Sequence, residues 1–245
     1  MKFKNLFFYF LSLSVLALAA CSGSNLAEEV ISDLSMDVAT ISHLNDGMPG
    51  TLNTEGQKEL VTTVDDSTVK YFIQELSFYF KDLEIFACEE SESSEPVILN
   101  LEQSVDFVSQ DDLQEFELLL GQTVALGEYC DWTLSFSGDE NGNAFYIEGA
   151  YSVDDAALIG FNWSTQTNFE VSGAFKAKDS EGLTFDHPIG GHHGAEVSLL
   201  FGLNYQMLLE GLDPSLGVES IVSDLLDRLI NGAFHHHADS DGDHH

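Results

Sequence analysis

Large apolar residues stand at alternate positions in part of residues 69–88, as they do in strands that bury only one face. The segment is rich in aromatic and β-branched residues, with Leu76, Phe78 and Phe80 at alternate positions. These residue types pack well on a pleated surface. The pattern therefore predicts β-structure here rather than a helix.

A second alternating stretch, residues 127–137, continues into a turn signal. One face of this stretch carries its large apolar residues, Trp132, Leu134 and Phe136. The tetrapeptide Asp139-Glu140-Asn141-Gly142 follows, and its Asn-Gly pair is typical of tight turns between paired strands. Residues 144–151 are therefore predicted to complete an antiparallel hairpin with the stretch.

The rest of the chain adds further strands and few helices. Four more strands or strand pairs are predicted, at residues 38–44, 97–101, 157–175 and 195–203. Short helices are predicted at residues 26–34 and 111–120. A longer amphipathic helix is predicted at residues 215–230, where apolar residues recur at helical spacing before Asn231-Gly232. Because strands and helices do not alternate, we predict a mostly β fold, an antiparallel β-sandwich with a short internal helix and a C-terminal amphipathic helix.

The N-terminal residues have the pattern of a secretory signal. Lys2 and Lys4 precede an apolar run that is too short to cross a bilayer. The run ends in Leu18-Ala19-Ala20-Cys21, which resembles the lipobox of bacterial lipoproteins, in which the cysteine is acylated. An ordinary signal peptide with an incidental cysteine is the alternative. The next residue is Ser22 rather than Asp, which favours an outer-membrane lipoprotein on the periplasmic or cell-surface side.

These signals divide the chain into four parts. Residues 1–20 are the expected signal peptide, and residues 21–25 are a flexible tether. Residues 26–232 form the predicted β-sandwich domain with its C-terminal helix. Residues 233–245 are predicted to be a flexible tail rich in His and Asp.

The composition indicates a folded and strongly acidic protein. The 245 residues include 8 Lys plus Arg and 42 Asp plus Glu, for a net charge of -34, and 44% are hydrophobic. This hydrophobic fraction is too high for a disordered acidic chain. The charge has the wrong sign for binding nucleic acid, and it concentrates cations near the surface. Solubility or adaptation to a saline habitat is the preferred explanation for most of this charge.

Two of the three cysteines are predicted to form a disulfide. With Cys21 acylated, Cys88 and Cys130 are the thiols that remain, in a compartment that oxidises thiols. Neither belongs to the Cys-x-x-Cys spacing of a redox or zinc site. The alternative is a pair of unbonded, buried thiols.

The order of these segments resembles that of two groups of secreted β-sandwich lipoproteins. They are the domain family DUF4382 and the MbnP-like family of copper-associated periplasmic proteins. The resemblance lies in the long aromatic strand, in Leu126-Gly127-Glu128-Tyr129 at the start of a strand, and in residues 196–203 followed by residues 208–213. It implies a β-sandwich in the periplasm. The metal ligands of the copper family have no counterparts at these positions, so copper binding does not follow from the resemblance.

Eight of the nine histidines follow residue 186, in two clusters. The first cluster lies in a glycine-rich segment and consists of Asp186, His187, His192 and His193. Neutral imidazole is a preferred ligand of zinc, copper and nickel, and glycines allow a loop to fold around an ion. The alternative is a loop whose histidines are simply exposed.

The second cluster is the C-terminal tail. Its candidate ligands are His235, His236, His237, Asp239, Asp241, Asp243, His244 and His245. Consecutive histidines in a flexible chain can supply several nitrogens to one ion, so the tail is predicted to chelate metal. The acids do not complete a calcium loop, because the glycine is misplaced and no bidentate Glu follows. A purification tag is the other explanation.

These features predict a metal-binding protein. We expect it to bind a divalent transition metal ion, zinc first and copper or nickel next, as a chaperone, buffer or delivery partner for an uptake receptor or transporter. A structural or adhesin-like binding module with an incidental His-rich tail is the alternative. A zinc-dependent hydrolase is the third hypothesis. We expect no enzyme activity, because the sequence lacks the common nucleophile, phosphate-loop, dinucleotide and zinc-protease motifs.

Overall fold

The fold was analysed in a computed structural model. It describes residues 33–43, 55–88, 95–108, 117–125, 127–178, 184–186, 188–190 and 196–239. Within these ranges, none of the helices has the length and hydrophobicity needed to cross a membrane.

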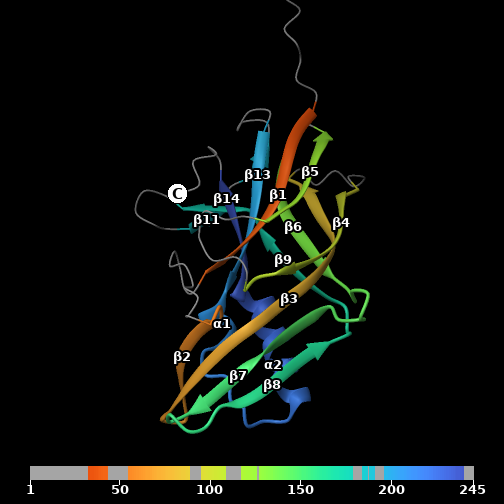
Figure 1. The fold of residues 1–245 in the computed structure, drawn as a ribbon. Coiled ribbons are helices and arrows are strands. Elements are labelled where there is room, and N and C mark those ends of the chain that lie inside the picture. Colours follow the sequence, from red (N-terminus) through yellow and green to blue (C-terminus); the bar gives the residue numbers. More distant parts are fainter. Residues whose placement is uncertain are drawn as a thin grey trace, which may run out of the picture. The chain divides into compact units, whose positions relative to one another are not determined.

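The larger sheet is built on one long strand, β3 (Ser67–Ala87). One edge of β3 pairs with β2 (Lys58–Val64) and then with β4 (Val97–Asp106). The other edge pairs with β7 (Phe145–Val153) and then with β6 (Glu128–Phe136). Three shorter strands extend this side, β8 (Ile159–Thr165) on β7 and both β9 (Phe169–Ala174) and β12 (Ile189–Gly190) on β6. All these pairs are antiparallel, and Figure 1 shows β3 running through the sheet.

The smaller sheet has the order β14-β13-β1-β5. It consists of β1 (Asp33–His43), β5 (Glu117–Ala125), β13 (Glu196–Asn204) and β14 (Phe234–Asp239). β1 runs parallel to β13, and the other two pairs are antiparallel. A separate two-stranded pair joins β10 (Lys176–Lys178) to β11 (Thr184–Asp186).

The helical segments lie between β13 and β14. They are α1 (Tyr205–Leu209), α2 (Val218–Arg228) and a π-helical turn at Leu229–Ala233. The predicted C-terminal amphipathic helix is confirmed as α2, which buries Ile221 and Leu225. The chain leaves its helical path at Asn231 and Gly232, where Gly232 has φ +126°, a conformation that favours glycine.

The alternation that predicts β3 is interrupted twice. The buried residues change from odd to even positions and back again, in the sequence Val69, Tyr71, Ile73, Leu76, Phe78, Phe80, Leu83 and Ile85. The pairing register shifts between Ile73 and Glu75 and again between Phe80 and Asp82. Each bulge inserts one residue, which returns the apolar side chains to the core face.

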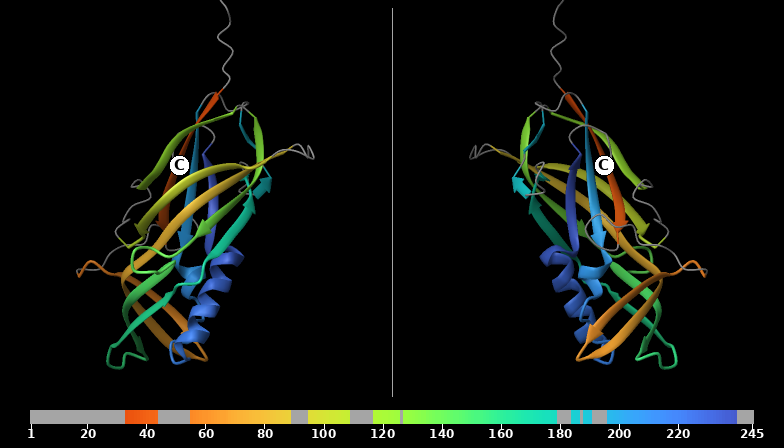
Figure 2. Two further views of the ribbon diagram at one scale, coloured as in Figure 1. Left: turned by 90° about the vertical axis from the view of Figure 1, so that its right-hand side faces the viewer. Right: turned by 90° about the vertical axis from the view of Figure 1, so that its left-hand side faces the viewer.

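The core has two parts that meet along β3. In the first part, the two sheets pack face to face, and Phe78 and Phe136 of the larger sheet contact Phe234 of β14. In the second part, the larger sheet packs on the helical segments, and the buried Tyr71 donates a hydrogen bond to the carbonyl oxygen of Leu212 at 2.8 Å. Figure 2 shows the helices beside this second part. The predicted sandwich is therefore confirmed, with helices replacing the second sheet over part of its length.

Three local predictions were wrong. Residues 157–175 form neither one long strand nor a hairpin, because β8 pairs with β7 and β9 pairs with β6. The segments 127–137 and 144–151 do not form a hairpin, because β6 and β7 both pair with β3 and follow one another along its edge. The predicted helix at residues 111–120 is contradicted from Glu117 onward, where the chain forms β5. Its earlier residues, and most of the helix predicted at residues 26–34, lie outside the described residues, while Asp33 and Leu34 of that segment begin β1.

Candidate metal centre

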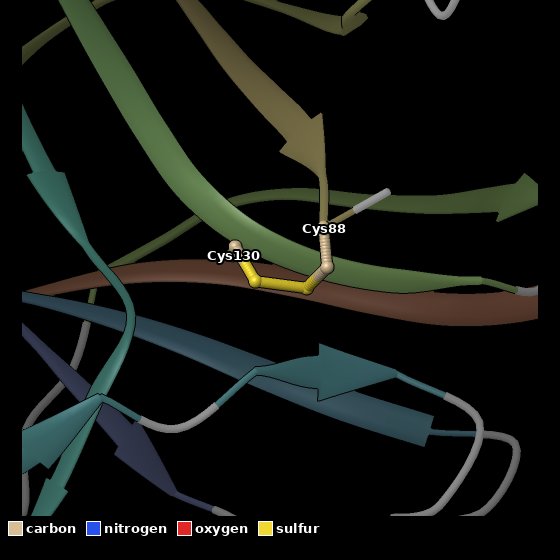
Figure 3. Close-up of a disulfide and its surroundings, with 2 residues drawn as sticks. All are labelled: Cys88 and Cys130. Atoms are coloured by element: carbon tan, nitrogen blue, oxygen red, sulfur yellow. A yellow bond between two sulfur atoms is a disulfide. The ribbon is translucent and has the colours of Figure 1, made fainter. Parts of the chain in front are cut away.

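The predicted disulfide is present. Cys88 follows β3, Cys130 lies in β6, and their sulfur atoms are bonded, as Figure 3 shows. The backbone N–H of Cys88 also donates a hydrogen bond to the carbonyl oxygen of Glu128 at 2.9 Å. The bridge therefore fixes the end of β3 to the strand that carries β12.

The first histidine segment is attached to β6 through β12. Ile189 is buried at 1% exposure, and it pairs with Tyr129. Gly190 has φ +146°, and a Cβ at this position would lie 1.8 Å from the carbonyl oxygen of Gly127. Only glycine allows so close a contact between the two backbones. The glycine-rich sequence thus reflects tight packing against β6 at this position.

The structure describes one of the four candidate ligands of this segment. Asp186 is exposed at the end of β11, where it pairs with Lys176 of β10. His187, His192 and His193 lie outside the described residues.

The predicted flexible tail is wrong in its first half. Residues 234–239 form β14, which pairs with β13 from Phe234 opposite Leu203 to Asp239 opposite Ser198. Phe234 is only 3% exposed and packs among aromatic rings of both sheets. Packing therefore explains part of the composition that suggested a chelating tail. The candidate ligands Asp241, Asp243, His244 and His245 lie outside the described residues, as does Cys21.

His235 and His236, which are consecutive in β14, occupy different environments. His236 is 9% exposed, and the centre of its ring lies 4.8 Å from that of Phe175 and 5.5 Å from that of Phe201. Trp132 lies farther away, at 6.3 Å. His235 is partly exposed, as expected for a neighbour in a strand. Phe234 and His236 are buried and His235 between them is partly exposed, which is the pattern of a strand with one buried face. The segment has only six residues of mixed composition, so its sequence alone does not predict a strand.

The contact of His236 with Phe175 brings the two candidate clusters toward each other. Phe175 directly precedes β10, β10 contacts β14, and the first residue of β10, Lys176, pairs with Asp186. Figure 1 shows β11 and β14 at the same end of the smaller sheet. Segments that are about fifty residues apart in the sequence therefore lie in one region.

These segments do not form a completed metal site in the part of the chain that the structure describes. Among those residues, no three His, Cys, Asp or Glu side chains lie close enough together to hold an ion. His237 and Asp239 belong to β14 by their backbone pairing.

A separate polar cluster lies on the larger sheet, and sequence analysis did not identify it. Glu75 of β3 pairs with Glu148 of β7, and Tyr146 donates a hydrogen bond to Glu148. This bond raises the pKa of Tyr146 to about 12. Partial burial, followed by the charges of Asp106 and Glu148, raises the pKa of Glu75. The cluster is an acidic surface, and among the described residues it contains no group of three or more possible metal ligands close enough together to hold an ion.

Comparison with known proteins identifies no relative, because no family model, curated protein or solved structure matches the chain. The resemblance to the two lipoprotein groups therefore stays a prediction.

Proposed function

We propose that this chain is a lipid-anchored exported protein that binds a divalent transition metal ion. Zinc is the first candidate, and copper or nickel are the others. Its role is that of a metal chaperone, buffer or delivery partner for an uptake system in the outer membrane. The observation that carries the proposal is that β14, which carries the partly exposed His235, contacts β10, whose first residue pairs with Asp186 of β11.

The chemistry of these groups supports the choice of metal. Imidazole nitrogens prefer zinc, copper and nickel to calcium or magnesium, which prefer oxygen ligands. Removing residues 1–20 leaves 6 basic and 42 acidic side chains, a net charge of -36. Such a charge raises the local concentration of cations around the histidines. An ion held loosely and near the surface can be passed on, as a delivery protein requires.

The lipid anchor is part of the proposal. Acylation of Cys21 leaves twelve residues from the lipid to the start of β1 at Asp33. Fully extended, this segment reaches about 40 Å. The tether therefore allows the domain to contact a membrane receptor while it stays attached. Replacing Cys21 with Ser tests the anchor, since it is expected to move the protein from the membrane fraction to the soluble fraction.

Calorimetric titration tests metal binding directly. The protein is residues 21–245 with Cys21→Ser, made without a purification tag and dialysed free of chelator. We expect micromolar binding of zinc or copper at neutral pH, with magnesium binding far more weakly as the control for attraction by the acidic surface. Failure to bind any transition metal ion more tightly than about 1 mM would refute the proposal.

The design of the variants follows from β14. Deleting residues 234–245 would remove a strand and the buried Phe234, so loss of binding would not separate lost ligands from lost structure. The informative variant keeps the strand and replaces His235, His237, His244 and His245 with Ala. It is expected to unfold at nearly the wild-type temperature and to bind the ion much more weakly.

A further inference from the structure

We infer that a polar hollow on the larger sheet binds a neutral sugar. The hollow has a volume of about 330 Å³ and lies where β3, β6 and β9 meet (Figure 1). This volume is at the lower end of the range for small-molecule sites. None of the residues that line the hollow is a candidate metal ligand, so the inference goes beyond the proposed function and does not rest on it. The lining consists of Lys81, Ser135, Phe136, Asn168, Phe169 and Glu170.

The pairing of the three strands shapes the hollow. Ser135 of β6 stands opposite Asp82 of β3 on one side and opposite Glu170 of β9 on the other. Next to them, the rings of Phe136 and Phe169 stack with their centres 4.6 Å apart, and both residues are buried. This core contact fixes β6 against β9, so the strands that carry the polar side chains are in place before a ligand binds. A preformed site avoids part of the cost of ordering the protein.

The polar side chains of the hollow include both hydrogen-bond donors and acceptors. Lys81 donates, Glu170 accepts, and the hydroxyl of Ser135 and the amide of Asn168 do both. Within the part of the chain that the structure describes, the side chains of Ser135, Asn168 and Glu170 make no hydrogen bond to protein, so a ligand can use them. Most small-molecule sites are lined by apolar side chains. A lining of this polar kind instead suits a ligand with hydroxyl groups over most of its surface, as a sugar has.

The charges around the hollow argue against a charged ligand. Nζ of Lys81 lies 3.2 Å from Oδ2 of Asp82, so a carboxylate already balances this ammonium group. The chain after residue 20 has 6 basic and 42 acidic side chains, a net charge of -36, which repels phosphates and carboxylates. A cation would find in the lining one carboxylate, that of Glu170, together with an ammonium group. A neutral sugar incurs neither of these penalties.

The first test is a nuclear magnetic resonance titration of the isotope-labelled mature protein, with Cys21→Ser and freed of metal. The probes are maltose, cellobiose, lactose and N,N′-diacetylchitobiose. At least one of them is expected to shift the backbone amide signals of Ser135, Phe169 and Glu170 and to saturate below about 10 mM. Inorganic phosphate and glutamate are the controls and are expected to leave these signals unchanged. The absence of a saturable shift with every sugar, or equal shifts with phosphate or glutamate, would overturn the inference and leave the proposed metal binding untouched.

The second test uses variants of exposed or partly exposed residues, which are expected to melt near the wild-type temperature. Ser135→Ala and Asn168→Ala are each expected to weaken binding of the sugar about fivefold or more. Glu170→Gln keeps an acceptor, so a loss of more than about tenfold would indicate a charged ligand and contradict the inference. The matched control is Thr133→Ala, on the same strand, because the hydroxyl of Thr133 bonds that of Ser172 at 2.8 Å and does not line the hollow. The control is expected to change the affinity less than about twofold, and a loss equal to that of Ser135→Ala would refute the site.

Discussion

Replacing Phe234 with Ala is expected to lower the free energy of unfolding by about 3 kcal/mol, the lower end of the range for a buried Phe. Phe234 is 3% exposed, and its ring centre lies 5.7 Å from that of Phe136 and 6.1 Å from those of Phe78 and Phe107. Since it stands at the start of the last strand, the chain around it can relax and fill part of the cavity. A domain of this kind has only about 5–15 kcal/mol of stability, so the loss is large.

Urea denaturation, followed by tryptophan fluorescence, measures this loss. Ile230→Ala is the matched control, because Ile230 belongs to the same C-terminal segment but is 46% exposed. The control is expected to change the stability by less than about 0.5 kcal/mol. If Phe234→Ala were as mild as the control, residues 234–239 would behave as a free tail, and the assignment of β14 to the core would be refuted.

Three other changes test other parts of the fold. Replacing both Cys88 and Cys130 with Ser is expected to lower stability by about 4 kcal/mol, read from urea melts, and a loss below about 1 kcal/mol would contradict the strand-fixing role of the bridge. Tyr71→Phe is expected to cost about 1 kcal/mol, since it leaves the buried carbonyl of Leu212 without its donor; an unchanged melt would exclude that bond. Glu75→Gln is expected to raise stability at pH 7 by about 0.3 kcal/mol after solvent screening. The raised pKa of Glu75 means that the folded protein binds its proton more tightly than the unfolded chain does, so the wild type gains stability as the pH falls through that pKa. The advantage of the variant should therefore disappear in acid, and an advantage that persisted there would refute the electrostatic cause.

The sequence predicts the fold best where the pattern is long. The many aromatic and β-branched residues of β3, together with the alternation at Leu76, Phe78 and Phe80, identify a strand. The helical spacing of Ile221 and Leu225 identifies α2 for the same reason. The segment around Leu118 is short and apolar, and such a run fits a helix or a strand equally well. Only its pairing with β1 makes it β5.

The hairpin prediction failed for a different reason. The turn chemistry was read correctly, because Asp139 accepts hydrogen bonds from the backbone N–H groups of Asn141 and Asn143, each at 2.8 Å. A local turn specifies the path of a few residues, but it does not specify which strand pairs with which. The 21-residue β3 provides an edge long enough for both β6 and β7, and its two bulges keep both in register with the core.

At the candidate site, too, composition predicted some features and only the structure revealed others. Counting cysteines was enough to predict the disulfide, because setting Cys21 aside as the expected acylated residue leaves two thiols, which have one way to pair. The number of histidines drew attention to the C-terminal segment, but composition alone cannot distinguish His235 from His236. Pairing with β13 makes them unequal, since a strand turns successive residues to opposite faces. Whether His235 or His236 can reach an ion therefore depends on the face of β14 that each occupies, and not on the number of imidazoles in the segment.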